Sequence, residues 1–115
     1  MADIQELLEV EEVDKVLEKT EENPAFIFKQ STTCPISAEA FEQFKSYVET
    51  DARPYEAYFV KVRETRPVSN EIEEKLGIEH QSPQLFFVKD GQAVWNASHR
   101  DITVENIIAA VEDNE

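Results

Sequence analysis

The run Ala25–Lys29 is short and almost continuously apolar, which is typical of a strand that is buried on both faces of a parallel sheet. Tyr55–Val62 is rich in aromatic and β-branched residues, which predicts a second central strand. Gln84–Lys89 and Gln92–Trp95 flank the dipeptide Asp90-Gly91, a strong signal for a β-hairpin. A chain with such strands must fold around a buried sheet that helices cover.

Amphipathic segments separate the predicted strands, with apolar side chains at helical spacing opposite charged ones. The predicted helices are Glu11–Glu22, a helix from Pro35 to about Thr50, a helix that Ser69 or Asn70 caps and Gly77 ends, and a helix that Thr103 caps. Asp51–Pro54 is predicted to be a turn. Ile4–Leu8 either opens a helix or forms a short edge strand, and the pattern does not separate these alternatives.

The order of these elements predicts an α/β protein. A βαβ unit, a helix, a β-hairpin and a closing helix give a central mixed sheet of four strands, with room for a short extra edge strand, and helices on both faces. The 115 residues suit one domain, 1–115. We expect the last residues, 112–115, to fray.

Acidic residues number 25 and basic residues 11, which gives a net charge of −14. Such a surface repels phosphate backbones and disfavours nucleic-acid binding, and solubility explains it more simply than an acidic docking surface does. No run approaches the roughly 20 apolar residues that a membrane span needs. The start, Met1–Glu6, lacks the pattern of a secretory signal. We therefore expect a cytoplasmic protein with no membrane partner.

The chain has one cysteine, Cys34, which lies between the first buried strand and the helix that begins at Pro35. One cysteine forms no internal disulfide and no cysteine-rich zinc site, and two histidines are too few for a metal site. Unpaired N–H groups at a helix N-terminus favour thiolate over thiol. The simpler alternative is an inert buried cysteine, but a proline at a helix start is an unusual setting for a core residue.

With Cys34 where a core strand turns into its helix, the order of elements resembles the thioredoxin fold. Ser82-Pro83 precedes the third core strand, where thioredoxin-like proteins place a cis-proline beside the active cysteine, so the resemblance implies a cis bond here. Cys34–Ser37 has serine where the wider family has a second cysteine. Four stretches together closely resemble the monothiol bacilliredoxin (YtxJ-like) family over nearly the whole chain: Thr33–Ser37, Arg66–Asn70, His80–Gln84 and Ser98-His99.

This resemblance implies that Cys34 is a catalytic nucleophile that removes bacillithiol, a low-molecular-weight thiol, from S-bacillithiolated cytoplasmic proteins. Bacillithiol would be a co-substrate; we expect no tightly bound cofactor, no metal and a monomer. Pro83 would pack against the sulfur, Ser82 would present its backbone to an extended substrate, and a second thiol or a reductase would regenerate the cysteine. The expected site residues are Thr33, Cys34, Pro35, Ile36, Ser37, Ser82 and Pro83.

Bacillithiol carries a malate group, so a cation near the sulfur would be useful on so acidic a surface. Lys29, Arg63 and Arg66 are candidates by their positions along the chain, and the sequence does not choose among them. Each is more often an ordinary surface charge. His80, in the loop before Pro83, is a candidate to tune the thiolate, although an ordinary loop histidine is the simpler interpretation.

Two other classes of function remain open. The same chemistry with another thiol would make the protein resemble a monothiol glutaredoxin, and a one-cysteine peroxidase would need an arginine and a threonine fixed around the sulfur. The second class is a non-catalytic, acidic binding module on a thioredoxin-like frame. The rates of Cys34 oxidation by peroxide and by the disulfides of the two thiols would separate the redox alternatives, and the rate of Cys34 alkylation against pH would separate these from the binding module.

Overall fold

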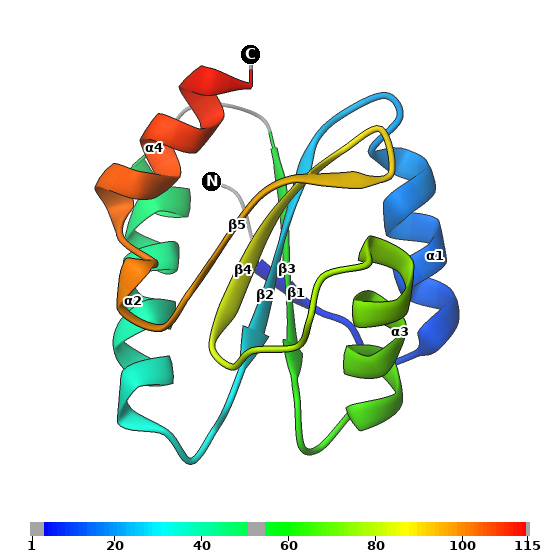
Figure 1. Ribbon diagram of the computed structural model, residues 1–115, viewed down its shortest axis with the longest axis horizontal. Coiled ribbons are helices and arrows are strands. Elements are labelled where there is room, and N and C mark those ends of the chain that lie inside the picture. The colour runs from blue at the N-terminus through cyan, green and yellow to red at the C-terminus, as the bar shows by residue number, and fades with distance from the viewer. Residues whose placement is uncertain (1–3, 51–54, 115) are drawn as a thin grey trace.

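Five strands and four helices make up the structure, a computed structural model that describes residues 4–50 and 55–114. The strands are β1 (Ile4–Glu6), β2 (Ala25–Gln30), β3 (Glu56–Lys61), β4 (Gln84–Lys89) and β5 (Gln92–Ser98). The helices are α1 (Val10–Lys19), α2 (Pro35–Thr50), α3 (Arg66–Leu76) and α4 (Val104–Asp113), and a short 3-10 helix, η1 (His99–Asp101), joins β5 to α4 (Figure 1).

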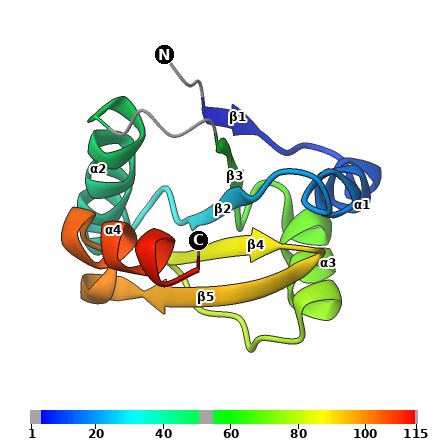
Figure 2. The same cartoon turned by 90° about the horizontal axis from the view of Figure 1, so that it is seen from above.

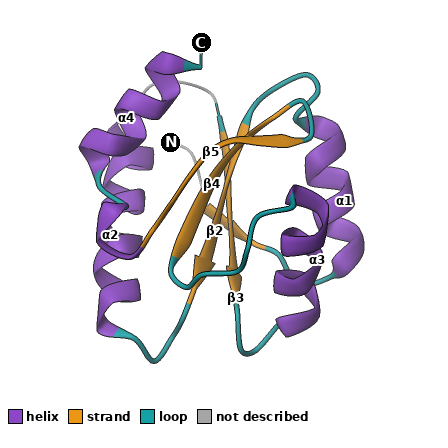
Figure 3. Cartoon of the chain, in the orientation of Figure 1, coloured by secondary structure: helices purple, strands orange, loops and turns teal. Residues whose placement is uncertain are grey.

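The strands form one mixed sheet in the order β1-β3-β2-β4-β5. β1 and β2 run parallel to β3, whereas β4 runs antiparallel to both β2 and β5. Helices α2 and α4 cover one face and α1 and α3 the other, so the sheet is the middle of three layers (Figures 2 and 3). The predicted mixed sheet with helices on both faces is confirmed, and Ile4–Glu6 supplies the short edge strand.

The hydrophobic core has two halves because successive side chains of a strand point to opposite faces of the sheet. Phe26 and Phe28 face α2 and α4: the Phe26 ring stacks on Phe87 at 4.7 Å, and the Phe28 ring stacks on Phe44 at 5.6 Å. Ile27 belongs to the cluster under α1 and α3. The side chains of Phe26, Ile27 and Phe28 are all buried, as the apolar run predicts.

The predicted hairpin turn is confirmed at Asp90 and Gly91, whose φ angles are 55° and 74°. Both residues thus have the positive φ that tight hairpin turns require. Thr20, at the end of α1, holds this turn: its carbonyl accepts from Asp90 N–H at 2.9 Å, and its Oγ1 accepts from Gly91 N–H at 2.8 Å. The turn is therefore fastened to a helix far away in the sequence.

The predicted start of the third helix is wrong. Ser69 and Asn70 lie inside α3, which begins at Arg66 after the N-cap residue Thr65. Proline is tolerated in the first turn of a helix, and Val68 is buried there, so packing on the sheet extends the helix by one turn. The predicted end is confirmed, since Gly77 has the left-handed φ of 67° that favours glycine.

The remaining boundaries differ little from the prediction. Helix α1 ends at Lys19, three residues before the predicted end. Thr103 caps α4 as predicted, because its side chain accepts from Asn106 N–H at 3.1 Å. Helix α4 continues to Asp113, into the tail that was expected to fray, while Glu115 and the predicted turn Asp51–Pro54 lie outside the described residues.

Candidate active site

Two loops meet at the end of the central strands where the cysteine lies. The first runs from β2 through Ser31 to Cys34, and the second enters β4 through Ser82 and Pro83. Lys29 pairs with Gln84 in the antiparallel β2–β4 ladder, so the next residues on each strand lie at one end of the sheet (the lower end in Figure 1). The Ser82-Pro83 bond is cis, which confirms the conformation that the resemblance implied.

Cys34 directly precedes Pro35, the first residue of α2, and is half-buried. Its carbonyl accepts from Ala38 N–H at 3.2 Å, the first hydrogen bond of the helix. Because Pro35 has no N–H, the first free amide donors of the helix belong to Ile36 and Ser37. Cys34 is thus the residue at the N-cap position of α2, next to the partial positive charge of the helix terminus.

Ser37 is completely buried in the first turn of α2. Its Oγ accepts a hydrogen bond from Ser31 N–H at 2.9 Å, which closes the loop that carries Cys34. This bond leaves the hydroxyl proton of Ser37 available to a second acceptor. Where a dithiol protein has a second sulfur, this chain therefore has a buried hydroxyl that shapes the loop.

The other predicted site residues lie around the rim of this loop. Thr33 and Pro35 are exposed, and Ile36 is half-buried. The neighbouring Thr32 donates from its Oγ1 to Glu64 Oε2 at 3.0 Å, which joins the loop to the residues that follow β3. The rim thus presents a threonine, a proline and an isoleucine beside the sulfur-bearing residue.

The cis-proline loop carries the far side of the site. Pro83 is buried, and its carbonyl accepts from His99 N–H at 3.1 Å. The hydroxyl oxygen of Ser82 is buried and makes no hydrogen bond to any part of the chain that the structure describes. A buried hydroxyl without a partner is costly, so Ser82 has spare hydrogen-bonding capacity next to Pro83.

Lys29 lies in the interior rather than on the surface. It is completely buried, and its Nζ is 3.1 Å from His80 Nδ1 and 5.8 Å from the centre of the Phe86 ring. Burial lowers the pKa of Lys29 to about 8, and Glu73 partly opposes this effect. Lys29 therefore joins β2 to the loop that leads to Pro83.

His80, the sequence candidate for tuning the thiolate, is the partner of this lysine. Burial and the positive charge of Lys29 lower the pKa of His80, which favours the neutral ring that accepts a hydrogen bond from an ammonium group. The backbone N–H of His80 donates to Glu73 Oε2 at 2.7 Å. His80 thus links the loop before Pro83 to Lys29 of β2 and to Glu73 of α3.

Of the other two candidate cations, Arg63 is exposed after β3 and Arg66 is exposed at the start of α3. Sequence reasoning missed Arg100, which lies in η1 next to His99 and lines a groove beside α2. Arg100 directly follows Ser98-His99, which carried part of the family resemblance, and this position was the sequence signal that could have identified it.

Neither a metal site nor a membrane-spanning helix is found in residues 4–50 and 55–114. No group of three or more histidine, cysteine, aspartate or glutamate side chains there could hold a metal ion. No helix in these ranges is long and apolar enough to cross a membrane.

A mixed sheet between two helical layers, a cysteine at the N-terminus of α2 and a cis-proline at the same end define the class: a thioredoxin-fold thiol–disulfide oxidoreductase. A solved structure, described provisionally as an oxidoreductase with a thioredoxin fold, matches with a TM-score of 0.84 and 34% identity over 94% of this chain and 93% of that chain. The family model for Monothiol bacilliredoxin BrxC matches residues 5–107. The chain belongs to the monothiol bacilliredoxin family.

More distant structures support the fold alone. Thioredoxin from Fasciola hepatica matches with a TM-score of 0.78 and 12% identity, over 97% of this chain and 100% of that chain. Thioredoxin from Malassezia sympodialis matches with a TM-score of 0.76 and 18% identity, over 98% and 91% of the two chains. These matches confirm the predicted fold, and the family model confirms the predicted family.

Proposed function

We propose that the protein removes bacillithiol from S-bacillithiolated proteins, with Cys34 as the only nucleophile. One observation carries this proposal: the cysteine of a chain in the monothiol bacilliredoxin family lies at the N-terminus of α2, and the second sulfur of a dithiol site is replaced by the buried hydroxyl of Ser37. Cys34 is only half-buried, so the residue is open to a disulfide that arrives from solvent.

The proposed reaction is two thiol–disulfide exchanges. The thiolate of Cys34 attacks the bacillithiol sulfur of the mixed disulfide, the old S–S bond breaks, and the client protein leaves as a thiolate that takes a proton from water. Cys34 now carries bacillithiol. The thiolate of a second bacillithiol attacks the sulfur of the bound one, which releases bacillithiol disulfide and restores Cys34. A reductase that supplies two electrons would serve equally in this second step.

In this proposal, different residues around Cys34 contact the client protein and bacillithiol. Pro83 forms the wall opposite Cys34 and has no N–H, and the backbone groups of Ser82 are those that an extended client segment would pair with. Thr33 and Ile36 form the rim over which bacillithiol enters. The proposed setting is the cytoplasm, where thiols are kept reduced and an unpaired cysteine remains available.

Intact-protein mass spectrometry tests this proposal. The reduced protein is mixed with a bacillithiolated client, and the mass of one bacillithiol should appear on the protein as it disappears from the client. Cys34→Ser should abolish the transfer while the variant remains folded. A client carrying glutathione, and hydrogen peroxide alone, should modify Cys34 more slowly. No transfer from the bacillithiolated client to the wild-type protein would overturn the proposal.

A further inference from the structure

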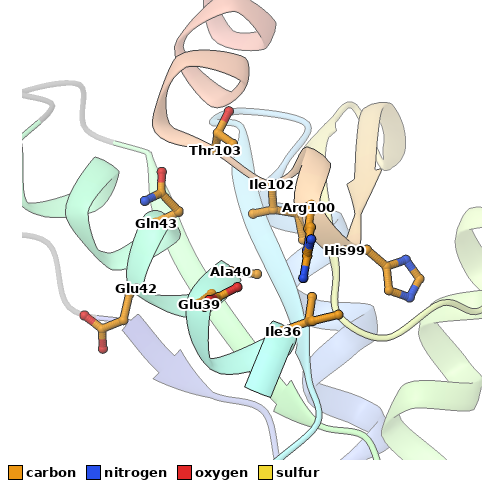
Figure 4. A pocket seen from close by; sticks show the side chains of 9 residues that line it. All are labelled: Ile36, Glu39, Ala40, Glu42, Gln43, His99, Arg100, Ile102 and Thr103. Carbon is orange, nitrogen blue, oxygen red and sulfur yellow. The ribbon is translucent and has the colours of Figure 1, made fainter. Parts of the chain in front are cut away.

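A groove of about 440 Å³ runs beside the cysteine-bearing end of α2. One wall is the first two turns of α2, and the other is the segment between β5 and α4. The residues that line it are Ile36, Glu39, Ala40, Glu42, Gln43, His99, Arg100, Ile102 and Thr103 (Figure 4). None of these residues was expected to bind a ligand except Ile36.

The groove is continuous with the candidate active site at its Ile36 end. Ile36 is separated from Cys34 only by Pro35, and it belongs to both the rim of the sulfur loop and the groove. On the opposite wall, His99 N–H donates to the carbonyl of Pro83 at 3.1 Å. A small molecule joined to the sulfur of Cys34 therefore has this groove as an adjacent surface.

Arg100 supplies the permanent positive charge of this groove. Its side chain extends toward Ile36 (Figure 4). Glu39 and Glu42 place carboxylates on the α2 wall. The buried side chains of Ala40 and Ile102 make part of the lining apolar. In a chain with a net charge of −14, an anionic ligand would be repelled from most of the surface, and among the residues that line this groove Arg100 has the permanent positive charge that attracts it.

We infer that this groove binds the non-sulfur part of the low-molecular-weight thiol, and that Arg100 pairs with its carboxylate. This inference rests on the proposed function, in which that thiol reacts at Cys34. A carboxylate such as those of the malate group would meet the guanidinium, whose fork of N–H donors suits bidentate pairing. The apolar lining would cover the rest of the ligand. Arg100 is thus a specificity-determining residue that holds the thiol without acting on the sulfur.

Exchange kinetics test the role of Arg100. Oxidation of reduced Cys34 is followed with bacillithiol disulfide and with the neutral hydroxyethyl disulfide. Arg100→Gln should slow the reaction with bacillithiol disulfide about fivefold, the size expected for one exposed charged pair, and leave the rate with hydroxyethyl disulfide unchanged. Lys15→Gln, which removes an equal charge from an exposed position of α1 on the other face of the sheet, is the matched control. Equal losses in both variants, or an equal loss with the neutral disulfide, would overturn the inference.

A spectroscopic test separates this inference from the proposed function. Two adducts of Cys34 are prepared with activated disulfides, one with bacillithiol and one with mercaptoethanol, and their amide NMR spectra are compared. The bacillithiol adduct should shift the amides of residues 36–43 and 99–103, and Arg100→Gln should reduce these shifts. If bacillithiol is transferred from clients but no amide in these ranges shifts, the inference about the groove is refuted and the proposed function stands. Shifts without transfer from clients would refute the proposed function and leave the groove standing.

Discussion

Lys29 brings an ammonium group into the interior of the protein, where charged side chains are rarely found. The contacts of its Nζ are the ring nitrogen of His80 and the face of Phe86. Removing a cation from water costs free energy that these partners repay only in part, and the lowered pKa of Lys29 reflects this cost. A lysine kept here at the expense of stability is expected to hold the loop that leads to Pro83.

Replacing Lys29 by Met, of similar length and without charge, should therefore stabilise the protein. We expect the free energy of unfolding at neutral pH to rise by on the order of 1–3 kcal/mol. The pKa of Lys29 is lowered from 10.5 to about 8 on folding, so the unfolded chain binds more protons between these values. The stability of the wild type should then rise with pH across this window, and the Met variant should lack that rise.

Urea unfolding at neutral pH and at about pH 9.5 measures both effects. Lys15→Met, at an exposed position of α1, removes the same charge and should change neither quantity by more than about 0.5 kcal/mol. A Lys29→Met protein that is less stable than the wild type would show that the contact with His80 outweighs the cost of burial.

Ser37 offers a second prediction, because its Oγ is the acceptor for Ser31 N–H. Ser37→Ala should lower the free energy of unfolding by about 1–2 kcal/mol, since it leaves a partly buried donor unpaired. It should also slow exchange at Cys34 without abolishing it, because the loop loses its closing bond. Ser46→Ala, at an exposed position of the same helix, is the matched control for urea unfolding and exchange rate. Equal behaviour of the two variants would contradict this role.

Residues close together in the sequence were the ones that could be predicted. Cys34 and Ser37 lie within one helical turn, so their places follow from where the helix begins. The pairing of Lys29 with His80 joins positions 51 residues apart, and the approach of Arg100 to α2 depends on how α4 packs. Such contacts are created by the tertiary fold, and a single sequence has no local pattern for them.

At the scale of elements, the predicted types were right and the boundaries less so. The strands were predictable because a strand buried on both faces requires a continuous apolar run. The start of α3 was wrong because Ser69 and Asn70 are good caps locally, whereas the burial of Val68 adds a turn before them. Packing outweighed the local preference of the cap residues.

The bond between α1 and the β4–β5 turn gives the prediction at this scale. Thr20 is buried, and its Oγ1 both accepts from Gly91 N–H and donates to the Leu17 carbonyl at 2.6 Å. Thr20→Val keeps the shape and removes both bonds, so we expect a loss of about 1–2 kcal/mol in the free energy of unfolding. Thr50→Val, at the exposed end of α2, should lose less than about 0.5 kcal/mol. Equal losses in the free energy of unfolding of the two variants, measured with urea, would contradict this role of Thr20.

At the scale of the whole molecule, a charge of −14 is carried on a body with a radius of gyration of 12.6 Å. Repulsion among the carboxylates destabilises the compact state, and salt shortens its range from about 10 Å at 0.1 M to about 3 Å at 1 M. We therefore expect added sodium chloride to raise the free energy of unfolding by on the order of 1 kcal/mol. Urea unfolding at the two salt concentrations measures this gain.

A variant with fewer carboxylates provides the control for the salt effect. Four exposed glutamates, Glu18, Glu21, Glu22 and Glu74, are changed to glutamine. This variant should gain less stability from salt than the wild type does. Equal gains in the two proteins would assign the effect to the salt's action on water rather than to screening.

The hydrogen bond from His99 N–H to the carbonyl of Pro83 has a consequence for the proposed binding of client proteins. Because that carbonyl already accepts a hydrogen bond and proline has no N–H, the proposed pairing with a client segment rests on the main-chain groups of Ser82. Main-chain pairing through a single residue gives little selectivity for the amino-acid sequence around the modified cysteine of the client. Under the proposed function, we therefore expect the protein to accept many client proteins with little selectivity for their sequences.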